Sequence, residues 1–94
     1  MMLSFSPGAL QRIEEIRAYI AQDSPAAAAR VAERFIIAAL RLERYPLSGR
    51  NGRVAGTREL VITSLPYILT YRIQAEVVEI ISVVHTSRKW PARF

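Results

Sequence analysis

The residues best suited to chemistry in this chain are one histidine and two arginines in its second half. His85 is the only histidine, Arg88 follows it after a short turn, and Arg72 lies in an earlier β-rich segment. RNA cleavage without a metal needs a base for the 2′-hydroxyl, cations for the phosphorane and an acid for the leaving oxygen. Histidine titrates near neutral pH, and arginine binds phosphate through two hydrogen bonds. The three residues therefore form a candidate catalytic set.

The same residues also have a structural interpretation. His85 stands at the end of a predicted strand, where its ring can hydrogen-bond the backbone. Arg72 and Arg58 lie on neighbouring predicted strands and could share a face as a phosphate clamp. They could equally form cross-strand ion pairs with the nearby acids, which are Glu59, Glu76 and Glu79.

Other cations are candidates for contact with phosphate or with a protein target. Arg50 and Arg53 lie in a glycine-containing loop and are expected to form an exposed cationic loop. Arg58 belongs to the same group. The tail past the last strand is apolar and cationic, so it is expected either to fold back on the sheet or to contact the target. Its candidate residues are Lys89, Trp90 and Arg93.

Three β-rich segments must position these side chains. They cover about 57–63, 67–73 and 77–84, and their short connections require antiparallel neighbours. Leu3 and Phe5 alternate with serines and predict a short first strand. The segment 77–84 is apolar on both faces near its end, which indicates a central strand or a face covered by a partner.

Two helices are expected between the first strand and the other three. Ser6-Pro7 and Ser24-Pro25 are typical helix starts, with serine as the N-cap and proline at the first helical position. The helices should end near Gln22 and Arg44 and pack as a tight antiparallel hairpin through alanine-rich surfaces. Their predicted buried stripes are Ala9, Ile13, Ile16 and Ile20, then Ala28, Val31, Phe35, Ala38, Ala39 and Leu42.

The element order β-α-α-β-β-β predicts an α+β fold: a four-stranded antiparallel sheet packed on an N-terminal helical hairpin. Counting chain reversals predicts that the first strand runs antiparallel to the strand that it joins. The length of 94 residues predicts a single domain, 1–94.

Composition excludes several classes of site. The chain has no cysteine and one histidine, so thiolate sites and histidine-rich metal clusters are excluded, and no cofactor or metal is expected. The start lacks a secretory signal and no apolar run could span a membrane, so a cytoplasmic protein without membrane contact is expected. The net charge is +5, and residues 46–94 hold seven basic residues against three acids. This distribution predicts an anionic partner.

Several motifs in combination resemble the RelE/ParE superfamily of bacterial type II toxins. They are Ser48-Gly49-Arg50, Gly52-Arg53-Val54, Gly56-Thr57-Arg58-Glu59-Leu60-Val61, Pro66-Tyr67-Ile68, Tyr71-Arg72, Val78-Glu79-Ile80, His85-Thr86, Arg88 and Trp90-Pro91. The resemblance covers essentially the whole chain, because the two N-terminal helices also fit the family layout.

The resemblance implies a toxin of a toxin–antitoxin (plasmid stabilisation) module that causes growth arrest. It also implies a cognate antitoxin, bound in a hetero-oligomeric complex, whose C-terminal segment wraps the helices and sheet. ParE-like members inhibit DNA gyrase, whereas RelE-like members are mRNA interferases that cleave mRNA on the ribosome. The nuclease pattern places arginine after the aromatic residue that begins the third strand, but here Tyr67 is followed by Ile68.

Because that replacement removes a phosphate-facing cation, the sequence favours a ParE-like gyrase inhibitor, which is not an enzyme. One alternative is a metal-independent endoribonuclease that acts on ribosome-bound mRNA through His85, Arg88 and Arg72. A second alternative is a non-toxic member that retains only antitoxin binding.

Overall fold

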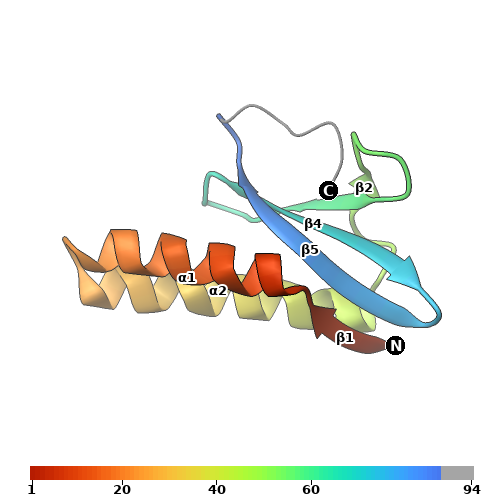
Figure 1. Ribbon diagram of the computed structural model, residues 1–94, viewed down its shortest axis with the longest axis horizontal. Helices are drawn as coiled ribbons and strands as arrows, with labels where there is room; N and C mark the ends of the chain where they lie inside the picture. The colour runs from red at the N-terminus through yellow and green to blue at the C-terminus, as the bar shows by residue number, and fades with distance from the viewer. Residues whose placement is uncertain (88–94) are drawn as a thin grey trace.

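The computed structural model describes residues 1–87 and has two layers, a helical hairpin against one face of a sheet (Figure 1). The helices and strands, in chain order, are β1 (Met2–Phe5), α1 (Pro7–Ala21), α2 (Pro25–Arg44), β2 (Arg50–Asn51), β3 (Arg58–Val61), β4 (Tyr67–Gln74) and β5 (Val77–His85). The α+β class and the helical hairpin predicted from the sequence are confirmed.

Both helices begin at the predicted serine caps. The Oγ of Ser6 accepts a hydrogen bond from the backbone N–H of Ala9 at 3.0 Å, and that of Ser24 accepts one from Ala27 at 3.1 Å. Each cap satisfies an N–H group that has no partner inside its helix. Neither α1 nor α2 is long and apolar enough to cross a membrane.

The sheet differs from the prediction in strand number and in one direction. Its order is β1-β5-β4-β3-β2, and the two-residue strand β2 makes it five-stranded instead of four-stranded. The prediction that the first strand runs antiparallel to its neighbour was wrong, because β1 pairs in parallel with β5. The prediction assumed a chain reversal after β1, but α1 continues in the direction of β1 (Figure 1). Only the turn between α1 and α2 reverses the chain before the sheet resumes.

Strand β5 is central, as its two apolar faces predicted, with β1 on one side and β4 on the other. Its pairing with β4 is irregular between Thr70 and Tyr71, whose partners are Ser82 and Ile80. Ile81 is therefore the extra residue of a β-bulge. The carbonyl of Ile81 accepts a hydrogen bond from the Ser6 hydroxyl at 2.8 Å. The bulge thus ties the start of α1 to the middle of the sheet.

The hydrophobic core lies between the helices and the face of the sheet formed by alternate residues of β4 and β5. On β4, Leu69 and Tyr71 are fully buried in this core, and Tyr67 packs at its margin. From the helices and from β5, the core includes Ala9, Ile16, Phe35, Ala38, Ala39, Leu42, Val78, Ile80 and Val83. Because side chains alternate along a strand, Ile68, Thr70 and Arg72 of β4 point to the opposite, outer face.

Tyr71 also fixes the loop that follows α2. Its hydroxyl accepts a hydrogen bond from the N–H of Gly49 at 2.9 Å and donates one to the carbonyl of Pro46 at 2.7 Å. A Cβ at Gly49 would lie 2.5 Å from this hydroxyl, so only glycine allows the approach. The loop that carries Arg50 and Arg53 is therefore anchored to the core through one phenol group.

The change Tyr71→Phe tests this anchor. Removal of the hydroxyl leaves the buried N–H of Gly49 without its partner, so the free energy of unfolding should fall by about 1–3 kcal/mol. The matched control is Tyr45→Phe, because Tyr45 is 56% exposed. Unfolding in urea, monitored by circular dichroism, measures the difference. If the two variants have equal unfolding midpoints, the Tyr71 hydroxyl does not anchor the loop.

Candidate functional site

His85 lies on the helix-facing side of the sheet, at the end of β5. It is paired with Tyr67, and the two rings meet edge to face with centroids 5.2 Å apart. The Tyr67 ring also meets the Phe35 ring of α2 edge to face, at 5.4 Å. Phe35, Tyr67 and His85 thus form an aromatic column from the core to the end of the sheet.

The hydrogen bonds of His85 determine which ring nitrogen carries the proton in its neutral form. The backbone N–H of Ser87 donates to Nδ1 at 3.1 Å, and the Ser87 hydroxyl lies 2.7 Å from the same nitrogen. Since a backbone N–H can only donate, Nδ1 is the acceptor and Nε2 carries the hydrogen. This tautomer offers a donor at Nε2, whereas a general base acting through Nε2 needs a lone pair there.

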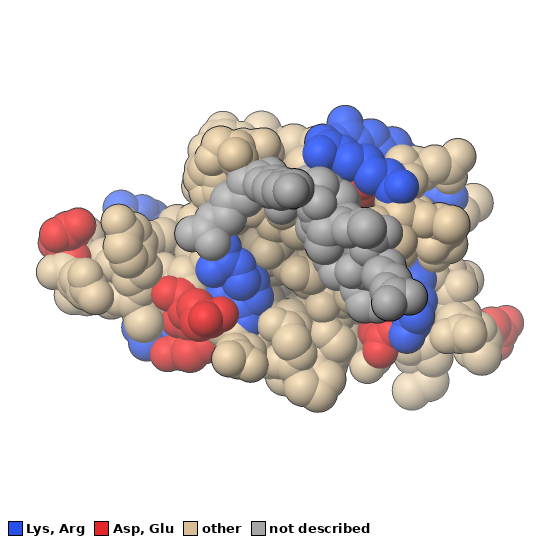
Figure 2. Space-filling model, turned by 45° about the horizontal axis from the view of Figure 1, so that its top comes forward, with Lys and Arg blue, Asp and Glu red and all other residues tan. Residues whose placement is uncertain are grey.

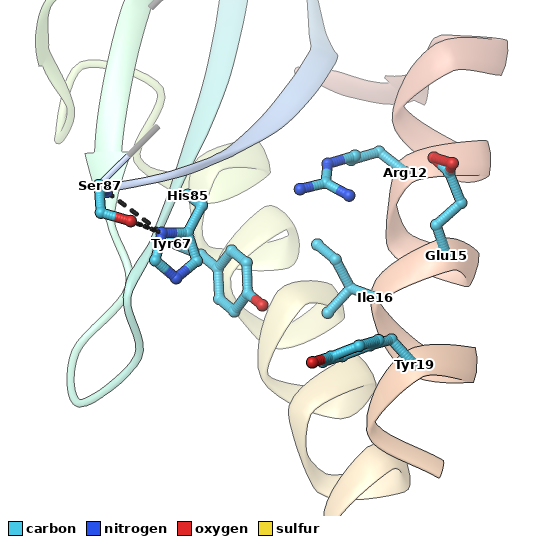
Figure 3. A pocket seen from close by; sticks show the side chains of 7 residues that line it. All are labelled: Arg12, Glu15, Ile16, Tyr19, Tyr67, His85 and Ser87. Carbon is cyan, nitrogen blue, oxygen red and sulfur yellow. Dashed lines mark hydrogen bonds between the residues drawn. The ribbon is translucent and has the colours of Figure 1, made fainter. Parts of the chain in front are cut away.

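A groove of about 490 Å³ runs beside this column, between α1 and the ends of β4 and β5. Its lining residues are Arg12, Glu15, Ile16 and Tyr19 from α1, with Tyr67, His85 and Ser87 from the sheet side (Figure 3). Arg12 and Tyr19 were not predicted from the sequence as site residues. Their only sequence signal is the spacing of seven residues, which places them on one side of α1 two turns apart.

Arg72 lies far from His85 and on the other face of the sheet. Its guanidinium forms an ion pair with Glu79 on β5, with 2.7 Å between Nε and the carboxylate oxygen. Tyr67 is the residue that pairs with His85. Arg72 lies five residues from Tyr67 along β4, which is a distance of about 16 Å along the strand. The structure therefore does not bring Arg72 and His85 together. Arg88, the third member of that set, lies outside the described residues.

Arg58 does not share a face with Arg72 either. It is paired with Tyr71 on β4, so the two arginines occupy opposite faces because neighbours along β4 alternate. Its guanidinium donates to the carbonyl of Gly49 at 2.8 Å and to that of Leu47 at 3.3 Å. The expectation of a clamp formed by Arg58 and Arg72 was wrong, and Arg58 instead binds the loop after α2.

The arginines of the glycine-containing loop surround Glu59, whose side chain is 1% exposed. Arg50 donates to the Glu59 carboxylate through Nε and Nη2, at 3.2 and 3.1 Å. The backbone N–H of Arg53 donates to the second oxygen at 2.8 Å, and its guanidinium lies 4.0 Å from the first. The sequence predicted Glu59 only as a pairing partner for Arg58 or Arg72. Its buried carboxylate instead holds both ends of the cationic loop.

The surface distribution of charge follows this arrangement. Figure 2 shows basic side chains gathered over the end of the molecule that carries β2 and the loop after it. The side chains of Arg50 and Arg53 are each about half exposed. Lys89, Trp90 and Arg93, the other predicted contact residues, lie outside the described residues. Within residues 1–87 no three His, Asp or Glu side chains are grouped to hold a metal ion.

The two-layer fold, the cationic loop and the sheet ending in His85 agree with the resemblance to the RelE/ParE superfamily that the sequence motifs indicated. Residues 3–90 match the family described as the ParE toxin of the type II toxin–antitoxin system parDE. The chain belongs to this ParE toxin family.

Individual relatives agree with this assignment. The chain is 52% identical over 83 residues to the Sinorhizobium fredii protein named "Putative toxin Y4kP", covering 88% of this chain and 85% of that protein. It is 41% identical over 80 residues to toxin RelE2 of Caulobacter vibrioides, covering 85% and 89%. A chain from a solved structure, "Chromosomal ParDE TA system from P. aeruginosa", has the same fold, with a TM-score of 0.83 and 19% identity. That match covers 93% of this chain and 97% of the other.

The change Glu59→Gln tests whether one carboxylate holds the cationic loop. Glutamine keeps the shape but removes the charge that Arg50 and the Arg53 N–H bind, so the free energy of unfolding should fall by about 1.5–3 kcal/mol. The loop should also open more often, and trypsin should cut after Arg50 or Arg53 several-fold faster, roughly in proportion to the population of opened molecules.

The matched control is Glu79→Gln, which removes a carboxylate from the more exposed pair with Arg72. An exposed pair contributes about 0–1 kcal/mol to stability. The free energy of unfolding and the rate of trypsin cleavage of this variant should therefore be close to those of the unmodified chain. Cleavage after Arg50 and Arg53 at the same rate in both variants would show that Glu59 does not hold the loop.

Proposed function

We propose that this type II toxin arrests growth by binding and inhibiting DNA gyrase, without catalysing a reaction itself, and that a cognate antitoxin neutralises it. The observation that carries the proposal is the separation of His85 from Arg72. A nuclease that relied on both residues would need them around one phosphate, within hydrogen-bond reach of the reacting groups. In this chain they lie on opposite faces of the sheet.

The state of each residue supports the same proposal. Arg72 is engaged by Glu79, and that carboxylate would compete with a substrate phosphate for its guanidinium. His85 is held by Ser87 and Tyr67 in a tautomer that presents a donor instead of a base. The family match adds support, because the matched family is ParE.

A second candidate function is ribosome-dependent mRNA cleavage, and one observation favours it. A relative with 41% identity is named RelE2, and the chain covers 89% of that protein. In this alternative His85, Arg72 and Arg88 would have to meet at the substrate. That requires the Arg72–Glu79 pair to break. It also requires His85 and Arg72 to contact one phosphate from opposite sides of the sheet.

Two assays with the purified chain separate these functions. We expect inhibition of gyrase-catalysed supercoiling of relaxed plasmid, and no codon-positioned cuts in mRNA bound to programmed ribosomes. The variant Arg72→Gln should inhibit gyrase within about threefold of the unmodified chain, because it loses only an exposed ion pair. Ribosome-dependent cleavage that Arg72→Gln abolishes, with gyrase unaffected, would establish the nuclease instead. Inactivity in both assays would leave only the antitoxin-binding function.

The outer surface of α2 supports an antitoxin partner. Ile36, Ile37 and Leu40 are 42, 47 and 52% exposed, an apolar surface that is costly to leave in water. Ile37 also lines a groove of about 360 Å³ between α2 and β3, together with Arg34 and Arg41. An amphipathic segment with acidic flanks would complement both the apolar strip and these arginines.

The change Ile37→Asp tests this surface. An aspartate at position 37 would be buried among apolar contacts in the complex. It should therefore weaken binding of the antitoxin encoded next to the toxin gene by more than about tenfold, measured by calorimetry. The matched control is Gln74→Asp, which adds the same charge at the exposed end of the β4–β5 hairpin. If both variants bind the antitoxin as the unmodified chain does, the antitoxin does not cover α2.

A further inference from the structure

The groove between α1 and the sheet contains a cation that no other described residue neutralises. Arg12 is half-buried, and within residues 1–87 it forms no hydrogen bond or ion pair. On the same helix, Arg17 is fully engaged by Glu14, at 2.6 and 2.8 Å, and this hydrogen bond lowers the pKa of the Glu14 carboxyl. A guanidinium that is partly desolvated without a partner costs free energy, which an anionic ligand would recover.

Two phenol groups face the same space as Arg12. Figure 3 shows the guanidinium of Arg12 and the hydroxyls of Tyr19 and Tyr67 directed into the groove, whereas the carboxylate of Glu15 points away. Neither hydroxyl forms a hydrogen bond within residues 1–87. The Tyr67 ring is held between Phe35 and His85, so its hydroxyl keeps a fixed position. One cation and two hydroxyl donors around one cavity suit a single carboxylate group.

We propose that this groove binds the side chain of a glutamate or aspartate in a segment of a protein partner. Arg12 binds the carboxylate, the hydroxyls of Tyr19 and Tyr67 donate to it, and Ile16 provides an apolar floor for a neighbouring side chain. The inference does not rest on gyrase being the target, because it concerns only the chemistry of the ligand.

The charges of the groove favour a protein segment over nucleic acid. A nucleic-acid surface gathers several cations along the path of the phosphates. Among the described residues that line the groove, Arg12 is the only arginine or lysine, and Glu15 stands at the rim, where it would repel the next phosphate of a strand. An isolated carboxylate with apolar neighbours meets no such repulsion.

The test uses the full chain, labelled with ¹⁵N, and two capped tripeptides as probes, Leu-Glu-Leu and Leu-Gln-Leu. The glutamate peptide should shift the backbone amide signals of Arg12, Tyr19 and Ser87 in a saturable way. It should bind at least about tenfold more tightly than the glutamine peptide, because a hydrogen-bonded charge contributes more than a neutral amide. In Arg12→Gln this preference should disappear, and Arg12→Lys should retain part of it.

The matched control is Arg17→Gln, which removes a cation from the same helix outside the groove and should leave the preference unchanged. Inorganic phosphate and a short oligothymidine are the competing probes. The proposal is overturned if no probe shifts these signals, if the two peptides bind equally, or if Arg12→Gln keeps the preference. Tighter binding of the oligothymidine at these residues would overturn it in favour of a nucleic-acid site.

Discussion

The alternation of side chains along β4 and β5 is the constraint on which the candidate sites depend. The helices cover one face of the sheet, so each strand residue either joins the core side or points to the outer face. His85 falls on the helix side, opposite Tyr67, and Arg72 falls on the outer side, opposite Glu79. A shift of one residue in the pairing would exchange the faces, but it would also expose Leu69 and Tyr71, which are fully buried. The core therefore keeps the histidine and the arginine apart.

Among the described residues of the second half of the chain, nearby acids organise most of the positive charge. Glu59 holds Arg50 and the backbone of Arg53, and Glu79 holds Arg72. A buried carboxylate is costly to desolvate, and only its hydrogen bonds and cationic neighbours offset that cost. The consequence is a cationic loop with a defined shape, in which the side chains of Arg50 and Arg53 are each about half exposed. Net charge alone predicted an anionic partner but not the carboxylate that shapes the cationic surface.

Local patterns in the sequence predicted most of the secondary structure. Ser6 and Ser24 cap the helices as expected, and the apolar stripe through Phe35 and Leu42 is buried. Two features could not be predicted in this way. One is the parallel pairing of β1, which depends on the direction of α1 after Ser6. The other is the conformation of the expected short turn after β4, in which Ala75 and Glu76 have positive φ angles of 51° and 63°. Such turns favour glycine or asparagine, so their usual signal is missing here.

The candidate site was only partly predictable for the same reason. Histidine and arginine types identified His85 and Arg72, but whether they meet depends on strand register, which no local motif contains. The groove combines Arg12 and Tyr19 of α1 with Tyr67 of β4, residues about fifty positions apart that only the packed fold brings together. Local sequence identifies Glu59 only as an acid near arginines, because the burial of its side chain depends on the loop that folds over it.

The aromatic column gives His85 a function in the structure that requires no proton transfer. Phe35 anchors Tyr67 from the core, and His85 contacts the same ring from the end of the sheet. Ser87 fixes the orientation of the imidazole through Nδ1, so the ring cannot turn without loss of two polar contacts. A histidine held in this way keeps the Tyr67 hydroxyl at the groove beside Arg12. Its place at the end of the last strand is then explained by packing and positioning, whichever target the toxin binds.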